Sequence, residues 1–335
     1  MLFCPLPYIF KFLAQSYKYF SLLQNFFVLL HSMKRICIVL SVFLAHACGS
    51  SEEKQRQQRA ADRQAERQAD SAALKIAVTP TLDCLPVFVA ERHGMFEREG
   101  LSVRLRPYQA QMDVDTAMQR GRVEAAFTDL VRAERLQKLG TPLRYATATN
   151  LFWQLVTNPQ ARLKRLNQLD DKMLAMTRYS ATALLADYAV DSAKLSTERV
   201  YRIQVNDVGV RLNMLENSII DAMLLPEPQA TTARNLKSPV LMDSRLLNQN
   251  YGVIAFSEKA LKSDGRQQQM NTFLKVYDMA CDSINERGLA AYGDIIAECC
   301  HVKSETVDSL PTDMRFQHAA APRQTDIERA KKWLK

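Results

Sequence analysis

The sequence contains none of the short patterns that mark a metal centre or a familiar catalytic site. None of its seven cysteines lies in a Cys-x-x-Cys pair, and its five histidines are scattered along the chain. Structural zinc sites need closely spaced ligands of these types, so no metal and no cofactor is expected. The sequence also lacks a Gly-x-Ser-x-Gly elbow, a Walker loop and any Ser/His/Asp or Cys/His grouping with a recognisable catalytic role. It therefore does not favour an enzyme.

Basic clusters with interleaved aromatic residues are absent from the body of the chain, although the formal net charge is +8. Half of that charge comes from the first 47 residues, which hold four basic side chains and no acidic one: Lys11, Lys18, Lys34 and Arg35. The excess charge therefore comes in part from a targeting segment, and no nucleic-acid partner is expected.

Residues 33–47 have the pattern of a secretory signal. Met33-Lys-Arg is followed by an apolar run from Ile36 to Leu44, which is too short to span a bilayer, and then by Ala45-His-Ala47. Because Cys48 follows directly, the segment resembles a bacterial lipoprotein signal, although a larger aliphatic residue is commoner at position 45. We expect export and lipidation of Cys48, with the protein anchored to the cell envelope on its periplasmic side or outer surface. Ordinary secretion and an uncleaved anchor are the alternatives.

Two further N-terminal segments carry little folding information. Residues 1–32 are apolar and aromatic but broken by prolines and lysines, and we interpret them as sequence upstream of the true start; an additional membrane helix is the alternative. Residues 48–73 comprise the cysteine and a charged linker with almost no apolar side chain larger than alanine, which predicts a solvated tether. The folded body is expected from Leu74.

From there, apolar strand patterns alternate with helical ones, which predicts an α/β fold with largely parallel sheets. The order strand, loop, helix, strand, helix, strand occurs twice. The expected strands are 74–78, 101–105 and 123–127, then 172–176, 200–205 and 219–225. The repeat predicts two similar lobes, with a ligand cleft where the carboxyl ends of their strands face each other.

Five segments carry a resemblance to a known family: Ala90–Val103, Gly121–Asp129, Ser180–Thr182, Ile220–Pro228 and Tyr251–Ser257. Over residues 74–335 the chain is similar to solute-binding proteins of ABC importers, in the nitrate/sulfonate/taurine and thiamine-precursor (NMT1/THI5-like) group. The sequence departs from the family at Glu124-Ala125, where Asp-Ala is usual, and at Leu225-Pro226, where tryptophan often precedes Glu-Pro. The cysteine-rich motif of pyrimidine-synthesising members is absent.

The resemblance implies a two-lobed type II periplasmic-binding-protein fold that closes on its ligand by hinge motion. Lobe 1 would comprise residues 74–155 and 253–335, and lobe 2 residues 156–252. The implied function is capture of a small molecule by a monomer and its delivery to permease and ATPase subunits. An enzyme on the same fold, acting on a pyrimidine or chorismate-derived substrate, and a surface lipoprotein that binds other proteins are the alternatives.

The candidate ligand-binding residues follow the predicted strands, where loops and helix N-termini converge. They are Thr81, Asp83, Cys84, Gln109, Asp113, Thr128, Asp129, Ser180, Ala181, Thr182, Glu227 and Pro228. Helix capping is the alternative role for Thr81, Asp83, Ser180 and Thr182, and an exposed loop for Gln109 to Asp113.

Three of the acids, Asp83, Asp129 and Glu227, are expected to face the cleft, where the only nearby cation is Arg178. A buried carboxylate needs a paired charge or a donor-rich ligand. The acids therefore favour an amine-bearing heterocycle, such as a pyrimidine, over nitrate or an alkyl sulfonate; acids that point away from the cleft would remove this argument.

Three remaining expectations concern packing. Cys281 is expected either to pair with Cys299 or Cys300 or to stay a free thiol, since export permits disulfides. Phe152 and Trp153 are expected at the first lobe crossing, in a core role rather than stacked on a ligand. Residues 322–335 are expected to form an amphipathic helix that docks on lobe 1.

Overall fold

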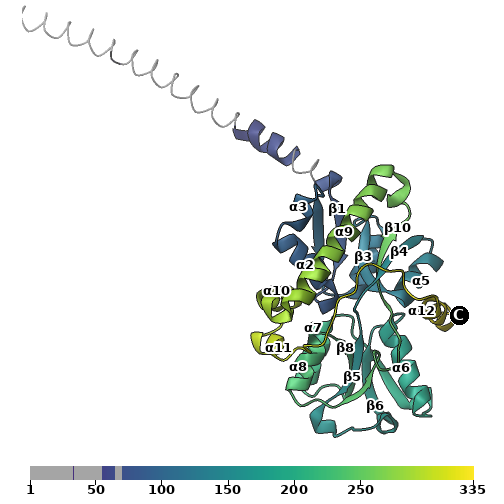
Figure 1. Cartoon of the computed structure of the whole chain (residues 1–335). Coiled ribbons are helices and arrows are strands. Elements are labelled where there is room, and N and C mark those ends of the chain that lie inside the picture. Colours follow the sequence, from purple (N-terminus) through teal and green to yellow (C-terminus); the bar gives the residue numbers. More distant parts are fainter. Residues whose placement is uncertain (1–32, 34–54, 65–69) are drawn as a thin grey trace, which may run out of the picture. The chain divides into compact units, whose positions relative to one another are not determined.

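The computed structural model describes Met33, residues 55–64 and residues 70–335. Residues 55–64 are helical and exposed, and Ala72–Lys335 form a separate compact unit, shown in Figure 1. The predicted lipidation site Cys48 and, apart from Met33, the predicted signal segment lie outside the described residues. Within the described part, no helix combines the length and apolar character that crossing a membrane requires.

The compact unit contains two five-stranded mixed sheets. The first sheet has the order β2-β1-β3-β10-β4. Its strands are β1 (Leu74–Val78), β2 (Val103–Pro107), β3 (Ala125–Asp129), β4 (Leu143–Ala148) and β10 (Gly252–Ser257). The second sheet has the order β7-β6-β8-β5-β9. Its strands are β5 (Trp153–Thr157), β6 (Lys172–Met176), β7 (Val200–Gln204), β8 (Ala222–Pro226) and β9 (Val240–Asp243).

The two sheets repeat one arrangement, as the internal repeat predicts. β1 pairs in parallel with β2 and β3, and β6 pairs in parallel with β7 and β8. The prediction of largely parallel sheets needs one correction in each sheet. β10 is antiparallel to both its neighbours, and so is β5. These are the strands that follow the chain's two passages between the sheets, so each enters its sheet in the opposite direction.

Helices cover the sheets and link their strands, and alternating strands and helices produce this layered α/β architecture. Those of the first half are α2 (Leu85–Arg92), α3 (Met95–Arg98), α4 (Gln111–Gln119) and α5 (Leu130–Lys138). Those of the second half are α6 (Ala181–Ser192), α7 (Val208–Glu216) and α8 (Gln229–Asn235). After β10 come α9 (Asp264–Arg287), α10 (Gly293–Cys300), α11 (Ser304–Asp308) and α12 (Gln324–Trp333).

The chain crosses between the sheets twice, after β4 and before β10. We call the first sheet with its helices lobe 1 and the second sheet with its helices lobe 2. β5 begins at Trp153 and already belongs to the second sheet; the boundaries at 155 and 252, as limits of independently moving bodies, stay predictions.

The two crossings lie side by side. Thr149 N donates to the Gly252 carbonyl oxygen over 3.0 Å, and Asn250 Nδ2 donates to the Thr149 carbonyl oxygen over 3.1 Å. A Cβ at position 252 would lie 2.4 Å from Thr149 Oγ1 and 2.5 Å from Leu151 Cβ. Only glycine permits this approach, so the two connecting segments are held together at one place.

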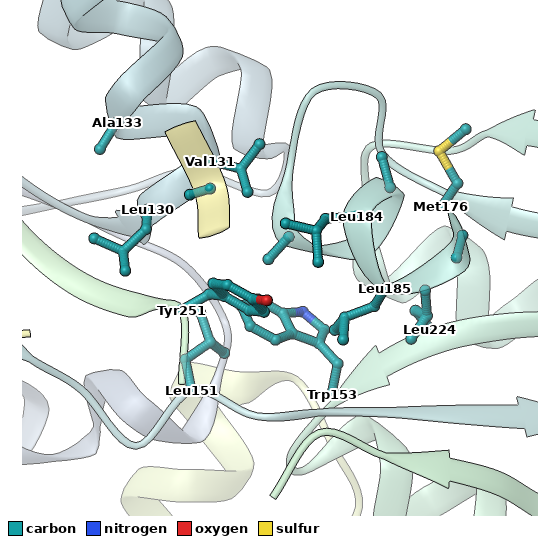
Figure 2. Packing of buried hydrophobic residues seen from close by; sticks show 14 of the residues in the cluster. Leu130, Val131, Ala133, Leu151, Trp153, Met176, Leu184, Leu185, Leu224 and Tyr251 are labelled. Atoms are coloured by element: carbon teal, nitrogen blue, oxygen red, sulfur yellow. The ribbon is translucent and has the colours of Figure 1, made fainter. Parts of the chain in front are cut away.

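One apolar cluster spans both lobes (Figure 2). Leu130 and Val131 at the start of α5 belong to it, as do Leu184 and Leu185 on α6. Trp153, 1% exposed, lies beside Tyr251, 0% exposed, beneath them. Trp153 therefore has the core role expected of it. Burial of apolar side chains from both halves holds the lobes together in this closed arrangement.

The C-terminal helix also contacts both lobes. α12 packs on α5 and on α6, and Trp333 Nε1 donates to Asp187 Oδ2 on α6 over 2.8 Å. The helix is amphipathic as predicted, with Ala330 buried and Lys331 exposed. The prediction that this helix docks on lobe 1 is therefore only partly correct, because the same helix also contacts lobe 2.

Candidate functional site

Asp129 connects the two lobes through a single carboxylate oxygen. The residue ends β3 and caps α5, because its Oδ1 accepts the N–H of Arg132 over 3.0 Å. The same Oδ1 accepts the N–H of Ala181, the first residue of α6 in lobe 2, also over 3.0 Å. A carboxylate at a helix N-terminus is stabilised by the unpaired N–H groups and the helix dipole. Asp129 therefore occupies the place at α6 that would otherwise suit an anionic ligand.

The hydroxyl groups around that helix start bind the backbone of their own turn. Ser180 Oγ accepts the N–H of Thr182 over 3.1 Å and donates to the Thr177 carbonyl over 2.7 Å. Thr182 Oγ1 accepts the N–H of Thr177 over 2.8 Å. Ser180, Ala181 and Thr182 are all 0% exposed. In the closed arrangement, these hydroxyls have the capping role that was the alternative for this segment.

Two buried acceptor atoms beside this contact lack a hydrogen-bond partner within the described residues. They are Thr128 Oγ1 and Asp129 Oδ2, on side chains that are 7% and 0% exposed. Burial raises the pKa of Asp129 to about 6, against the lowering effect of Arg132. A buried oxygen without a donor is costly, so this corner of the interface is suited to a group that brings a proton or a positive charge.

Asp83 lies in lobe 1, and its carboxylate accepts hydrogen bonds from two hydroxyl groups. Thr81 Oγ1 donates to its Oδ1 over 2.6 Å and Thr149 Oγ1 donates to its Oδ2 over 3.1 Å. Burial raises the pKa of Asp83 to about 6, although these hydrogen bonds lower it. Cys84 is buried beside it, and burial raises the pKa of its thiol. Both carboxylate oxygens are thus already occupied, and Asp83 fixes the first crossing through Thr149.

The raised pKa of Asp83 predicts a pH dependence of stability. Between pH 4 and pH 6 the folded protein holds this proton more tightly than the unfolded chain, so the free energy of unfolding falls as pH rises. We expect a contribution of about 2 kcal/mol lost between pH 4.5 and 7.5, and Asp83→Asn should remove it in urea titrations. Asp113→Asn, at an exposed position on α4, is the control. An unchanged pH slope in Asp83→Asn would mean that the hydroxyls keep Asp83 ionised at low pH.

Glu227 and Pro228 lie at the other edge of the interface, joined by a cis peptide bond. Glu227 Oε2 accepts from Thr231 N over 3.0 Å and from Thr231 Oγ1 over 2.7 Å, and Oε1 lies 2.8 Å from Arg234 Nη2. The carboxylate therefore anchors the start of α8. Glu227 contacts the other lobe through its main chain, because Leu82 N donates to the Glu227 carbonyl oxygen over 2.8 Å.

The second strand's residues do not join this group. Asp113 is exposed in the first turn of α4. Gln109 is exposed too, and its Nε2 lies 3.1 Å from His301 Nε2. Most of the other predicted residues meet at the contact between lobes, whereas these two lie outside it.

Two polar residues that the sequence analysis missed complete the contact. Gln229 Nε2 donates across the lobes to the carbonyl oxygens of Pro80, over 2.7 Å, and Cys300, over 3.2 Å. Thr149 binds Asp83, as described above. Neither residue stands in a motif, and their partners are far away in sequence, so only a three-dimensional arrangement reveals them.

The closed interface leaves little space at the crossings. A cavity of about 10 Å³ lies there, lined by residues that include Phe152, Gln154, Glu227 and Arg245. That volume is about what one water molecule needs. A molecule larger than water needs more space than this cavity provides.

All four cysteines of the compact unit are free. Cys84, Cys281 and Cys300 are buried, and Cys299 is half-buried. The free-thiol alternative therefore holds, and the disulfide between Cys281 and Cys299 or Cys300 is absent. Within the described part of the chain, no three His, Cys, Asp or Glu side chains gather as ligands for a metal ion.

The two mixed sheets and their double connection define an α/β fold of the periplasmic-binding-protein class, as solved structures show. The alkanesulfonate-binding protein SsuA from Xanthomonas axonopodis pv. citri, bound to MOPS, matches with a TM-score of 0.64 at 16% identity, over 78% of this chain and 91% of that chain. The aliphatic sulphonate-binding protein SsuA from Escherichia coli matches with a TM-score of 0.62 at 15% identity, over 78% of this chain and 86% of that chain. The nitrate-binding protein NrtA from Synechocystis PCC 6803 matches with a TM-score of 0.62 at 12% identity, over 75% of this chain and 74% of that chain.

The family follows from the sequence itself. The family model described as NMT1/THI5 like matches residues 81–286, so the chain belongs to this family and the resemblance noted above is confirmed. A comparison with curated proteins finds no match.

Proposed function

We propose that this chain is the solute-binding component of an ABC importer, held to the cell envelope by a lipid on Cys48. It captures a small molecule between its lobes and delivers it to permease and ATPase subunits, without transforming it. Membership of the NMT1/THI5 like family supports this proposal, as does the likeness of its fold to proteins whose names state that they bind sulfonates and nitrate.

The mechanism that the geometry favours is hinge closure. The lobes join at two adjacent crossings, and their contact consists largely of strand ends and helix starts that hydrogen bond across it. Ligands of open α/β folds bind at such strand ends. Separation of the lobes would expose Asp129, Ala181 and Gln229 together, and closure around a ligand would exchange their mutual bonds for bonds to it.

The ligand class follows from one observation, the bond between Asp129 Oδ1 and Ala181 N. Because the chain's own carboxylate satisfies the start of α6, an anionic ligand gains nothing there and would be repelled. Asp129 Oδ2 instead calls for a donor, and the Thr128 hydroxyl can either accept or donate. Of the three acids, Asp83 and Glu227 have partners within their own lobes, so the argument for an amine-bearing heterocycle, such as a pyrimidine, depends on Asp129.

Native mass spectrometry of the purified full chain tests capture directly. We expect a stoichiometric small molecule, carrying an amine or ring N–H group, that is released on denaturation. A protein that is empty, and whose melting temperature is unmoved by amines, pyrimidines, sulfonates and nitrate, would contradict the capture function. A bound sulfonate or nitrate would uphold capture and overturn the ligand class.

The lipid anchor has its own test. Metabolic labelling with an alkyne analogue of palmitate should label the chain and place it in the membrane fraction. Cys48→Ser should lose the label and leave the membrane fraction, whereas Cys299→Ser should keep both. Equal labelling of the wild type and Cys48→Ser would exclude Cys48 as the acylated residue.

A further inference from the structure

A second cavity, of about 350 Å³, lies in lobe 1 beside the contact between lobes. It opens where β1 and β2 end, between α2 and the end of α10. Its volume falls in the range of small-molecule sites in proteins, roughly 300–1,000 Å³. All of its lining residues belong to lobe 1, so a molecule can enter it without separation of the lobes.

The floor of this cavity is apolar. It consists of Val78 from β1, Phe88 from α2, Leu105 and Pro107 from β2, and Pro80 from the loop after β1. An aromatic or aliphatic body placed here would bury its apolar surface, at roughly 25 cal/mol per Å² removed from water.

The polar lining supplies acceptors and negative charge. Glu91 on α2 and Glu298 on α10 line the cavity, together with Gln109, Cys299 and His301, and no Lys or Arg is among the lining residues. Glu298 is paired with Arg92 over 2.5 Å. Glu91 has no ion-pair partner within the described residues. Burial raises the pKa of its carboxyl, against the lowering effects of a hydrogen bond from the Leu105 backbone and of the nearby Arg104 and Arg92. Glu91 is thus the available anion of this site.

The end of α10 adds to this charge. The helix stops at Cys300, and His301 follows in the left-handed region. The last carbonyl groups of a helix carry a partial negative charge that favours a cation. These carbonyls therefore act in the same direction as Glu91.

The walls are held in place from the other lobe. Gln229 Nε2 donates both to Pro80 O, on the loop wall, and to Cys300 O, beside the α10 wall. One amide thus ties together the two segments that border the opening. The cavity is preformed in the closed protein, which lowers the cost of binding.

We propose that this cavity is a second binding site, for a small organic cation with an apolar body. The apolar part lies on Phe88, Leu105 and Pro107, and its ammonium or amidinium group faces Glu91 and the end of α10. The site is distinct from the cleft between lobes, because residues of lobe 1 alone line it.

Cys299 supplies the readout, because it is the half-buried free thiol of the compact unit and lines the cavity. We expect phenethylammonium chloride to slow alkylation of Cys299 by iodoacetamide at pH 8.5 in the full chain, followed on the Cys299 peptide by mass spectrometry. 2-Phenylethanol, with the same body and no charge, should protect at least ten-fold more weakly, and 3-phenylpropionate should not protect.

Variants test which acid provides the negative charge of this site. Glu91→Gln should weaken protection by phenethylammonium about ten-fold, whereas Glu328→Gln, an exposed acid on α12, should leave it unchanged. Asp129→Asn should also leave it unchanged, because that residue belongs to the cleft. Equal protection by all three probes, or protection that depends on Asp129 rather than Glu91, would overturn the proposal. The melting temperature of each variant, measured alongside, checks that it is folded.

Discussion

Asp115→Ala is expected to lower the free energy of unfolding by about 3–5 kcal/mol, since it leaves a buried guanidinium without its partner. Arg132 on α5 is 2% exposed, and it binds both carboxylate oxygens of Asp115 on α4 through Nε and Nη2. Arginine stays charged at any accessible pH, so it cannot escape the penalty by losing a proton. Domains of this kind are stabilised by only about 5–15 kcal/mol, and urea titrations followed by tryptophan fluorescence measure the loss.

A matched pair tests whether burial is the cause. Arg199 binds Asp170 in the same two-pronged way, over 2.5 and 2.6 Å, but with side-chain exposures of 61% and 37%. Asp170→Ala should change the urea midpoint little, because water solvates both charges once they are separated. The double variant Asp115→Leu with Arg132→Met should recover most of the stability that Asp115→Ala loses. A loss of similar size in Asp170→Ala would refute the explanation by burial.

Asp129→Asn is expected to separate stability from binding. Its Oδ1 can still accept from Arg132 N and Ala181 N, while the buried charge is gone. Because burial raises the pKa of Asp129 to about 6, the wild type loses stability between pH 4 and 6 that the variant keeps. We expect the variant to be about 1–2 kcal/mol more stable at pH 7.5, with the difference disappearing near pH 4 in urea titrations.

The same variant should bind its solute between ten- and a hundred-fold more weakly, because a hydrogen bond to a charged acceptor contributes roughly 1.5–3 kcal/mol. In the wild type, an amine ligand should also bind more weakly as pH falls below about 6, since Asp129 then takes up a proton. Isothermal titration with the solute identified by mass spectrometry measures both effects. Asp129→Ala, which also removes the cap of α5, should lose stability as well as binding. Unchanged affinity in Asp129→Asn would remove this residue from the ligand site.

The sequence by itself determined most of the local structure. β1 and β6 have the limits that the sequence predicts, 74–78 and 172–176, because a mostly apolar run of about five residues is the length of a strand and too short for a typical helix. The internal repeat predicted two similar lobes, and the matching strand orders β2-β1-β3 and β7-β6-β8 agree with it. Side-chain capping was also readable for Ser180, because a cap depends on residues within one turn.

Only the tertiary structure decided which of these groups share a site. Asp129 bonds to Ala181 and Asp83 to Thr149, and both contacts join residues more than fifty positions apart. The reversed direction of β5 and β10 likewise follows from how the chain returns between sheets. No local pattern encodes such pairings, because they depend on the packing of whole elements brought together by burial of a common core. The chemistry of each residue was therefore legible in the sequence, and its partner was not.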